Sequence, residues 1–385
     1  MKIAFTAPMK PLDDPIPSGD RTMGRLIVKA LEAGEHEVRI ATRFRSWRKD
    51  GGEDLQRAVK QDALAEAERI AKEWDAENYR PDIFLTYHLY HKAPDWIGPA
   101  LADRFSIPYA IMEASRAPKR KTGHWAFGFA AADEALARAD QVAALHRADS
   151  ECLADVVPKD RLRVLLPFLD TRAFETDSSP AQTDSIAGDK PLKLLTVAMM
   201  REGDKTHSYE VLAAALGKVQ DLPWHLTIVG DGPARDHILP LFPADRITMR
   251  GALPPDDLPA HYAAHDLFVW PAIREAFGFV FLEAQASGLG VVAGDTFGVP
   301  DIVIDGETGL ISPEGDAEAF AQNLRKVLED TSLAARLGEA ARAHIKANHR
   351  LQAGTRRLNA FLEAAQDQYW HRMPSDKRYA ATDLT

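Results

Sequence analysis

The sequence predicts an α/β protein built from two domains, each with its own parallel β-sheet. Short apolar runs alternate with amphipathic helical stretches along most of the chain, a pattern typical of parallel sheets covered by helices on both faces. The length of 385 residues is more than one compact core needs and fits two domains. Apolar residues make up 45% of the chain and charged residues 27%, so we expect a folded protein.

The first domain is expected over residues 1–175. Helical patterns alternate with its predicted strands, and the longest is a charged stretch that ends near Trp74. The five predicted strands are KIAFTAP (2–8), HEVRIAT (36–42), PDIFLTYH (81–88), IPYAIM (107–112) and DQVAALH (140–146). This order of elements favours a Rossmann-like domain.

The stretch TDSSPAQTDSIAGDK predicts the interdomain linker at residues 176–190, because it is rich in Ser, Thr, Asp, Pro and Gly. A second Rossmann-like domain is expected over 191–360, and residues 361–385 are expected to form a C-terminal helix or tail that packs back on the first domain. The strands predicted in the second domain are LKLLTVAM (192–199), WHLTIVG (224–230), DRITMRG (245–251), DLFVWPA (266–272) and LGVVAG (289–294).

Composition excludes several classes of function. The formal net charge of −10 argues against broad nucleic-acid binding, which needs a basic face. The single cysteine, Cys152, excludes an internal disulfide and any paired-cysteine zinc site. No apolar stretch approaches the ~20 residues that span a bilayer, and MKIAFTAP reads as a first strand rather than a signal peptide. We therefore expect a cytoplasmic protein.

Functional residues are expected on the loops that follow strands, because ligands bind beyond the carboxyl ends of open parallel sheets. The strand that ends near Trp270 places Glu275 on such a loop and Gly278 at the start of the next helix. A helix start offers unpaired N–H groups and a partial positive charge, which suit a phosphate. Glu283 shares a helix face with Phe279, where its carboxylate could accept hydrogen bonds from ribose hydroxyls, and Glu275 could bind sugar hydroxyls. The alternative is that Glu283 is a solvated helix residue and Glu275 an ordinary loop acid.

At this point the sequence resembles the retaining glycosyltransferases of family 4. The family's pattern of an acid, seven residues and a second acid matches EAFGFVFLE, from Glu275 to Glu283. Other similar segments are IVGDGP (228–233), LPAHYAAHDLFVWPA (258–272), ASGLGVVAGD (286–295) and GVPDIVIDGETGLI (298–311). The resemblance implies the GT-B fold, in which two Rossmann-like domains face each other across an interdomain cleft.

The resemblance also implies roles for individual residues. Glu283 is expected to bind the ribose of a nucleotide and Glu275 the hydroxyls of the transferred sugar. Lys205, in the loop REGDK, is expected to neutralise the charge that builds on the leaving diphosphate, with Arg201 as a second cation. The remaining donor-binding residues are Gly278, Phe279 and Val280, whose backbone would hold the diphosphate, together with Gly19, Gly230 and Gly298. No metal or other cofactor is expected.

The first domain departs from the family pattern in two places. After the first strand the family has a glycine pair; here Gly19 is followed by Asp20 and Arg21, which either form a loop ion pair or leave Arg21 to meet phosphate. Where the family often carries a histidine, the segment IPYAIMEAS has Glu113, which we expect to orient or deprotonate an acceptor hydroxyl. His88 and His91 also follow a strand, but no third metal ligand has a recognisable spacing.

Two basic segments of the first domain, Arg43–Lys49 and Arg116–Lys121, interleave basic and apolar residues. They are either solvated loops or contacts to anionic lipid headgroups or to an acceptor pyrophosphate, since basic residues near a membrane contribute about 1 kcal/mol each. The second interpretation would place the protein peripherally on the inner face of a membrane.

The sequence therefore predicts a metal-independent glycosyltransferase of the hexosyltransferase type, which moves a sugar from a nucleotide diphosphate sugar to a glycan, lipid-linked or small-molecule acceptor. Two alternatives remain: a sugar-nucleotide epimerase on the same fold, and a degenerate sugar-nucleotide-binding protein. A dehydrogenase is disfavoured, because Arg235 stands where the third glycine of a dinucleotide-binding motif would follow Gly230 and Gly232. The nucleotide, the sugar, the acceptor and the oligomeric state are not predicted.

Overall fold

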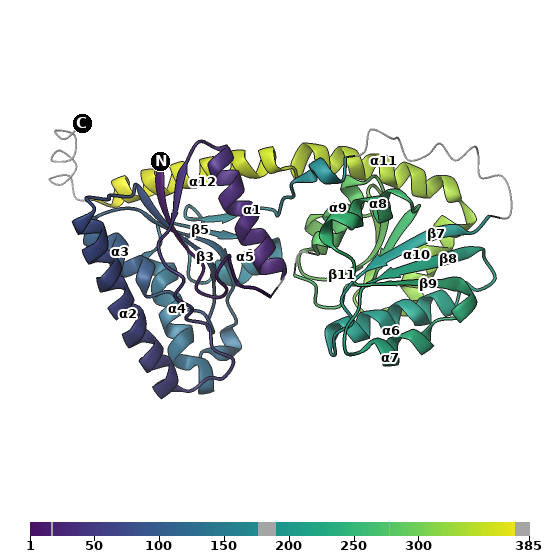
Figure 1. The fold of residues 1–385 in the computed structure, drawn as a ribbon, viewed down its shortest axis with the longest axis horizontal. Helices are drawn as coiled ribbons and strands as arrows, with labels where there is room; N and C mark the ends of the chain where they lie inside the picture. Colours follow the sequence, from purple (N-terminus) through teal and green to yellow (C-terminus); the bar gives the residue numbers. More distant parts are fainter. Residues whose placement is uncertain (17, 176–189, 277, 374–385) are drawn as a thin grey trace. The chain divides into compact units, whose positions relative to one another are not determined.

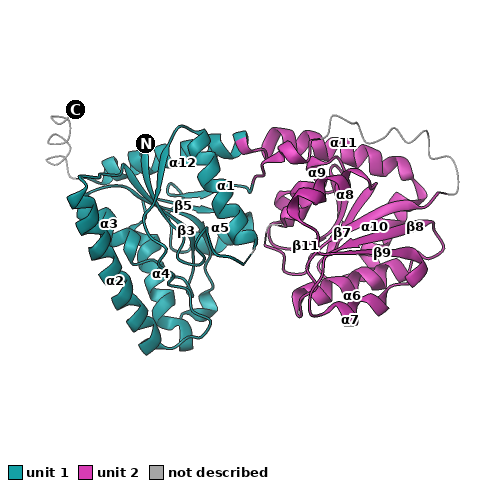
Figure 2. Cartoon of the chain, in the orientation of Figure 1, with its two compact units in different colours: residues 1–167, 352–385 teal, residues 168–351 magenta. Residues whose placement is uncertain are grey.

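The structure, a computed structural model, describes residues 1–16, 18–175, 190–276 and 278–373 (Figure 1). The chain forms two compact units, which are described one at a time: residues 1–167 together with 352–385, and residues 168–351 (Figure 2). Residues 176–189, nearly all of the predicted linker, and residues 374–385 of the predicted tail lie outside the described residues.

The first unit contains a six-stranded, wholly parallel sheet in the order β2-β1-β3-β4-β5-β6. Its strands are β1 (Lys2–Thr6), β2 (Glu37–Ile40), β3 (Ile83–Leu89), β4 (Tyr109–Ala114), β5 (Gln141–Ala144) and β6 (Leu162–Val164). Its helices are α1 (Gly19–Ala33), α2 (Glu53–Ala76), α3 (Ile97–Phe105), α4 (Ala126–Arg138), α5 (Arg147–Leu153) and α12 (Leu351–Arg372). Strands β3, β4 and β5 are almost entirely buried, which explains their mainly apolar sequences.

The second unit repeats the architecture with the strand order β12-β11-β10-β7-β8-β9, again all parallel. Its strands are β7 (Leu192–Val197), β8 (Trp224–Val229), β9 (Ile247–Gly251), β10 (Leu267–Trp270), β11 (Gly290–Asp295) and β12 (Gly309–Pro313). Its helices are α6 (Asp204–Gly217), α7 (Arg235–Ile238), α8 (Leu258–Ala263), α9 (Phe279–Ala286), α10 (Ala317–Glu329) and α11 (Thr331–Asn348). This strand order is that of a Rossmann sheet.

The loops of both units contain short 3₁₀ helices. They are η1 (Pro118–Arg120), η2 (Gly123–Trp125), η3 (Thr171–Ala173), η4 (Leu239–Leu241), η5 (Ala244–Arg246), η6 (Pro255–Asp257) and η7 (Val299–Asp301). Among the described residues, no helix is both long and apolar enough to cross a bilayer.

All ten strands predicted from the sequence are present, and two further strands, β6 and β12, were not predicted. Strand β6 has only three residues and none of them is fully buried, so it has little apolar pattern. Strand β12 reads GLISP, and its glycine and proline are signals that usually mark a loop. Both lie at a sheet edge, where partner strands rather than intrinsic preference decide the conformation.

The last helix, α12, belongs to the first unit although it follows the second unit in sequence (Figure 2). The Thr355 hydroxyl donates a hydrogen bond to the Ala30 carbonyl at 3.1 Å, and Arg372 pairs with the buried carboxylate of Asp140 at 2.9 Å. The apolar face of the helix is fully buried at Leu358, Phe361, Leu362 and Ala365. The helix is therefore an integral part of the first unit.

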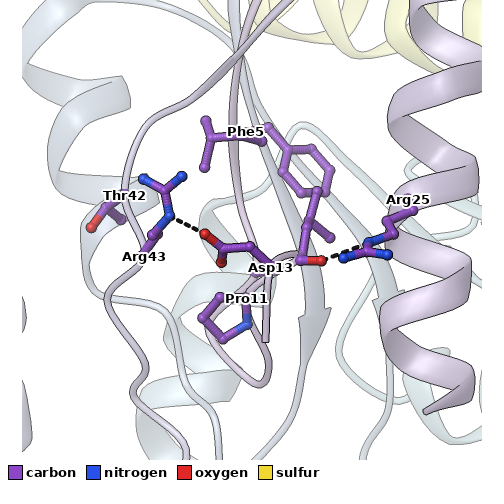
Figure 3. A pocket seen from close by; sticks show the side chains of 9 residues that line it. Phe5, Pro11, Asp13, Arg25, Thr42 and Arg43 are labelled. Atoms are coloured by element: carbon purple, nitrogen blue, oxygen red, sulfur yellow. Dashed lines mark hydrogen bonds and ion pairs between the residues drawn. The ribbon is translucent and has the colours of Figure 1, made fainter. Parts of the chain in front are cut away.

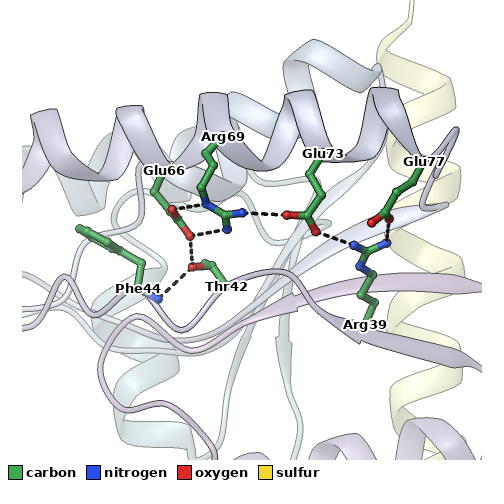
Figure 4. Close-up of polar contacts among 7 residues, drawn as sticks. All are labelled: Arg39, Thr42, Phe44, Glu66, Arg69, Glu73 and Glu77. Carbon is green, nitrogen blue, oxygen red and sulfur yellow. Dashed lines mark hydrogen bonds and ion pairs between the residues drawn. The ribbon is translucent and has the colours of Figure 1, made fainter.

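Helix α2 is held to the neighbouring chain segment by a chain of charged contacts (Figure 4). Arg39, in β2, bridges Glu73 and Glu77 at 2.7 and 2.5 Å. Arg69 links Glu73 to Glu66, which accepts a hydrogen bond of 2.6 Å from the Thr42 hydroxyl. These side chains are partly exposed, so each pair contributes at most about 1 kcal/mol. The buried face of α2, which includes Ile70 and Trp74, packs in the core of the unit.

Candidate active site

In the second unit, successive strands are added on one side of β7 and then on the other, so the strand order reverses between the neighbouring strands β7 and β10. Strands β8 and β9 follow on one side of this point, and β11 and β12 on the other. The loops that leave the carboxyl ends of β7 and β10 diverge there, which is where ligands bind in open α/β sheets. Lys205 follows β7 and Glu275 follows β10, so both residues lie at this point.

Lys205 and Glu275 form an ion pair that joins the two loops. Lys205 lies in the first turn of α6, after Gly203, which has a φ of +86°. Its Nζ also lies 5.4 Å from the centre of the Trp270 ring, within cation–π range. The two charged side chains remain 23% and 19% exposed, so a ligand can reach them.

The loop that carries Glu275 has an unusual backbone. Ala272 and Arg274 have φ of +57° and +48°, a left-handed conformation that non-glycine residues seldom adopt. The Ile273 N–H donates to Ser208 Oγ at 2.9 Å and the Arg274 N–H to the Glu314 carboxylate at 2.7 Å, so surrounding side chains enforce this shape. Backbone strain of this kind costs about 1–3 kcal/mol per residue and is concentrated at functional sites.

Gly278 begins α9 with φ of +54°. A Cβ at this position would lie 2.5 Å from the Phe281 ring and 3.2 Å from Glu275 Cγ, so the turn requires glycine. Phe279 and Val280 follow in the first turn of α9 and are half-buried. The helix start predicted from the sequence is therefore present next to Glu275, whereas Phe277 lies outside the described residues.

Glu283 lies one turn further along α9, and its carboxylate accepts a hydrogen bond of 2.8 Å from the Tyr262 hydroxyl of α8. Tyr262 is completely buried, and its ring packs edge-on against Phe174. Burial raises the pKa of Glu283, and the Tyr262 hydrogen bond lowers it in part. Glu283 is thus a partly buried, oriented carboxylate rather than a solvated helix residue.

The other donor-side residues predicted in this unit lie far apart in the sequence and differ in their surroundings. Arg201 is exposed, and its carbonyl accepts hydrogen bonds from the N–H and hydroxyl of Thr206 at 3.1 and 2.8 Å. Gly230, at the end of β8, has φ of +145°, and a Cβ there would lie 1.9 Å from the Ala198 carbonyl oxygen. The Gly298 N–H donates to the Ala276 carbonyl at 3.2 Å, which ties it to the Glu275 loop.

In the first unit, Gly19 is the exposed first residue of α1, and the preceding Ser18 caps the helix through a 3.2 Å hydrogen bond from the Arg21 N–H. The Arg21 guanidinium donates to the Asp14 carbonyl at 2.8 Å. Arg21 therefore holds the loop that follows β1, while its neighbour Asp20 contacts a histidine.

That histidine is His88, which together with Asp20 and Glu113 forms the Asp20–His88–Glu113 cluster. His88 Nδ1 lies 2.9 Å from Asp20 Oδ1 and 3.4 Å from Glu113 Oε1. Burial lowers the pKa of His88, but Glu113 and Asp20 outweigh it and raise the pKa to about 9. Burial raises the pKa of Glu113 to about 7, with Asp20 acting in the same direction and His88 against it.

His91 is separate from this cluster. Its ring packs edge-on against Trp125, at 5.5 Å between centroids. Burial, with help from Arg120 and Lys92, lowers the pKa of His91 to about 4. The residue is therefore a neutral packing residue near neutral pH.

The two basic segments differ in which of their charged side chains are exposed to solvent and which already contact a protein partner. Arg116 is mostly buried and forms a bidentate pair with Asp133 at 2.9 and 3.0 Å, whereas Lys119, Arg120 and Lys121 are exposed. In the other segment the guanidiniums of Arg43 and Arg45 are exposed but have partners: Arg43 contacts Asp13, and Arg45 stacks over Trp47 at 4.5 Å.

A pocket of about 270 Å³ opens between α1 and the carboxyl ends of β1 and β2 (Figure 3). Its wall is mainly apolar, with Phe5, Leu12 and Ile40, and two guanidiniums lie at its edge. Arg43 contacts Asp13, and Arg25 donates to the Leu12 carbonyl at 2.7 Å, so both cations help to hold the loop over the pocket.

Comparison with known proteins identifies the second unit. Residues 182–344 match the family described as glycosyl transferases group 1. The match covers less than half of the chain, and this segment, called the group 1 domain below, is similar to that family. It contains Arg201, Lys205, Gly230, Glu275 and Glu283, as well as Gly298 and the start of α9.

Two curated relatives each match about half of this chain. The sulfoquinovosyl transferase SQD2 of Arabidopsis thaliana is 32% identical over 49% of this chain and 37% of its own length. A GDP-mannose-dependent alpha-(1-6)-phosphatidylinositol monomannoside mannosyltransferase of Mycobacterium tuberculosis is 31% identical over 53% of this chain and 56% of its own. The matches span between about a third and just over half of these relatives.

The fold of the whole chain also has solved counterparts. The Anabaena protein HepE, crystallised in complex with UDP, superimposes with a TM-score of 0.70 at 16% identity, over 94% of this chain and all of HepE. Together with the two six-stranded parallel sheets, this likeness confirms the predicted α/β fold class, GT-B.

Sequence reasoning did not foresee several residues that shape these sites. Tyr262 and Ser208 orient the acid Glu283 and the Glu275 loop, respectively, and Asp20 completes the histidine cluster. A tyrosine or serine on a helix carries no distinguishing pattern, so the first two could be found only from the folded chain. Asp20 did have a signal, because it follows the first strand and is an acid at a position where a glycine was expected.

Proposed function

We propose that this protein transfers a sugar from a nucleotide diphosphate sugar to an acceptor hydroxyl, with retention of anomeric configuration and without a metal to hold the diphosphate. The observation that carries the proposal is the ion pair of Lys205 and Glu275 at the divergence of the β7 and β10 loops, beside the start of α9. It supplies a cation for a diphosphate and an acid for sugar hydroxyls in one place.

Each residue of the group 1 domain has a role in this proposal. Lys205 neutralises charge on the leaving diphosphate, with Arg201 as a second cation, while the backbone at Gly278, Phe279 and Val280 binds its oxygens. Glu283 accepts hydrogen bonds from the ribose, and Glu275 exchanges its contact with Lys205 for the hydroxyls of the donor sugar. Gly230 and Gly298 let the backbone approach the donor closely.

On the acceptor side we assign Glu113 to the acceptor hydroxyl, and Gly19 to a close approach of the backbone to the substrate. The relatives' names support a nucleotide sugar and a lipid-linked acceptor: HepE was crystallised with UDP, and the mycobacterial relative uses GDP-mannose on a phosphatidylinositol mannoside. A hexosyl group on a nucleoside diphosphate is the donor class proposed here.

A thermal-shift screen of UDP, GDP, ADP, CMP and dTDP sugars, followed by incubation of each binder with and without acceptors, tests the proposal. Sugar appearing on an acceptor supports transfer. An epimerised sugar nucleotide without an acceptor would indicate the epimerase, and binding without turnover would indicate a degenerate binding protein.

Two substitutions separate binding from turnover. Glu283→Gln removes the charge that the ribose hydroxyls contact and is expected to raise the Kd for the nucleotide roughly tenfold. Glu275→Gln is expected to lower kcat by about tenfold or more with a smaller change in Kd, because its contact is made to the reacting sugar. Calorimetric titration and initial rates measure the two effects. Glu339→Gln, on the exposed face of α11, is the control, and an unchanged Kd and kcat in both site variants would show that the site is misplaced.

We also propose a peripheral contact with anionic lipid through the exposed cations of the two basic segments, which would place the protein at the inner face of a membrane. Arg116 is excluded from this contact because Asp133 already occupies its guanidinium. Co-sedimentation with liposomes that contain or lack anionic lipid tests the idea. Lys119→Glu combined with Lys121→Glu is expected to reduce binding, whereas no sedimentation of the natural protein with either liposome would rule out the contact.

A further inference from the structure

The Asp20–His88–Glu113 cluster lies at the point where the order of strands in the first sheet also reverses. Strand β1 pairs with β2 on one side and β3 on the other, and β4 follows β3. Asp20 comes from the start of α1, after β1, whereas His88 and Glu113 come from the carboxyl ends of β3 and β4. Three separate segments thus bring charged side chains to the edge of the sheet where ligands bind.

The backbone at two of these residues is strained. His88 and Glu113 have φ of +62° and +59°, although neither is glycine and each lies within a strand, β3 and β4 respectively. Such a conformation costs about 1–3 kcal/mol per residue and persists where a ligand clamp requires it. The same departure at the ends of two neighbouring strands aligns the two side chains, whose Nδ1 and Oε1 atoms lie 3.4 Å apart.

The contacts within the cluster are incomplete. His88 Nδ1 lies within ion-pair distance of both carboxylates, yet it makes no directed hydrogen bond to either. Glu113 is only 6% exposed, and its Oε2 receives no directed hydrogen bond among the described residues. The Tyr87 side chain lies close enough to lower the pKa of Glu113, but its hydroxyl donates to the Asp20 carbonyl at 3.1 Å. A buried carboxylate oxygen without a donor is unfavourable by roughly 1–3 kcal/mol, so a ligand that donates a hydrogen bond there would be stabilised.

We propose that this cluster is a subsite for a neutral hydroxyl of the substrate, which donates its hydrogen bond to Glu113 Oε2, and that Asp20 and His88 are positioning residues for Glu113. Naming that hydroxyl as the acceptor's rests on the proposed function; the arrangement itself does not. The three side chains bring ligand atoms within 4.8 Å of one another, a set that could also hold a metal ion. Near neutral pH the His88 imidazolium disfavours a cation and the two acids repel a phosphate or carboxylate, so a neutral hydroxyl fits the cluster.

The two positioning residues shift the pKa of Glu113 in opposite directions. His88 carries a positive charge near neutral pH and favours the ionised, hydrogen-bond-accepting form of Glu113, whereas Asp20 disfavours it. Asp20 Oδ1 lies 2.9 Å from the same imidazole nitrogen, Nδ1, that faces Glu113. The other charged or titratable groups that act on the cluster are Tyr87, Tyr90, Asp149 and Lys10. Asp149 raises the pKa values of His88 and Glu113, and Lys10 lowers that of Asp20.

These opposite shifts of the Glu113 pKa can be tested, because a purely structural role of His88 and Asp20 would not produce them. In the full chain with carbon-13-labelled glutamate carboxyls, the Glu113 signal is assigned by its loss in Glu113→Gln and titrated from pH 4 to 9 by NMR. His88→Gln is expected to raise the pKa of Glu113 by about one unit or more, and Asp20→Asn to lower it. His91→Gln, which alters a neighbouring histidine outside the cluster, is expected to leave it unchanged.

The same variants then distinguish positioning from catalysis once a donor and acceptor are known. The acid limb of kcat/KM is expected to move to higher pH in His88→Gln and to lower pH in Asp20→Asn, with Glu113→Gln losing the limb altogether. Because the NMR titration needs no substrate, failure of every sugar nucleotide would contradict the proposed function and leave the titration to decide the arrangement of the cluster.

Two results would overturn the inference. One is a Glu113 pKa that does not change, or changes in the same direction, in His88→Gln and Asp20→Asn. The other is tight, stoichiometric binding of Mn²⁺ or Zn²⁺ by calorimetry that each of the three substitutions abolishes, since a cation would then occupy the atoms assigned here to a hydroxyl contact.

Discussion

At the scale of single residues, the two acids of EAFGFVFLE differ in their surroundings because they contact different side chains. Glu275 faces Lys205 across two loops, and its side chain remains partly exposed. Glu283 instead contacts the buried Tyr262, and burial raises its pKa. One acid is therefore already paired with the cation expected to meet the diphosphate, and the other is held in a fixed direction by a neutral donor.

Tyr262→Phe isolates this orienting hydrogen bond. The substitution leaves the Glu283 carboxylate without its protein donor, so we expect about 1 kcal/mol less free energy of unfolding and a higher Glu283 pKa. Nucleotide affinity should then fall more at pH 6 than at pH 8, which titration calorimetry at both values measures. Tyr209→Phe is the matched control, because that hydroxyl donates to the Ala198 carbonyl rather than to an acid. Equal losses of affinity at both pH values would contradict this role of Tyr262.

At the scale of elements, helix α3 shows how one buried acid can join a helix to a sheet. Asp95 Oδ1 accepts hydrogen bonds from the N–H groups of Ile97 and Gly98, both at 2.9 Å. Its Oδ2 accepts from the hydroxyls of Thr86 in β3 and Tyr109 in β4, at 2.5 and 2.8 Å. The helix start is thereby fixed to two central strands of the first sheet.

Asp95→Ala is expected to destabilise the protein by roughly 3 kcal/mol or more, because four donors in a buried region lose their acceptor. Asp95→Asn should be less costly, since its amide oxygen can still accept from the helix N–H groups. Asp103→Ala, which removes an exposed partner of Arg138, should change the free energy of unfolding by less than about 1 kcal/mol. Urea unfolding of the three variants measures this order, and an Asp95→Ala value near that of Asp103→Ala would contradict it.

Elements with strong apolar runs were predictable, and those set by their neighbours were not. Buried strands such as β3 and β10 follow from sequences that fit little else, and the helix start after Gly278 follows from the loop before it. Strands β6 and β12 could not be predicted because sheet pairing outweighs their weak local preference. Likewise, the sequence indicated that Glu275, Lys205 and Glu113 follow the ends of strands. It could not show that Lys205 pairs with Glu275, or that Glu113 and Asp20 both contact His88. Those contacts join segments that are far apart in the chain.

At the scale of the whole molecule, the buried charges of the first unit predict how stability depends on pH. The pKa of Glu113 is raised from 4.5 to about 7 and that of His88 from 6.5 to about 9. Groups with a raised pKa in the folded state contribute stability below their unfolded pKa, and this contribution is lost as pH rises through the folded value. Between pH 5 and pH 7 this loss is opposed by His91, whose pKa is lowered to about 4 and which stabilises the fold as it becomes neutral. The free energy of unfolding should therefore fall between pH 7 and pH 9, where His91 no longer titrates.

Urea unfolding of the full chain at pH 7, 8 and 9, followed by circular dichroism, measures this slope. Glu113→Gln should flatten it, because the variant removes one titrating group and the charge that raises the pKa of the other. The comparison starts at pH 7, since Asp20 and His91 both have a lowered pKa and change their contributions only in more acidic solution. A slope that is flat or rising in the natural protein would contradict the assignment.

The discontinuity of the first unit bears on the order in which the molecule is assembled during synthesis. Residues 168–351 form an uninterrupted stretch, whereas the first unit needs α12, made only after all of that stretch has been translated. The amino-terminal sheet must therefore wait on the ribosome, with the surface that receives Leu362 and its neighbours uncovered, while the later-made group 1 domain can fold completely before it.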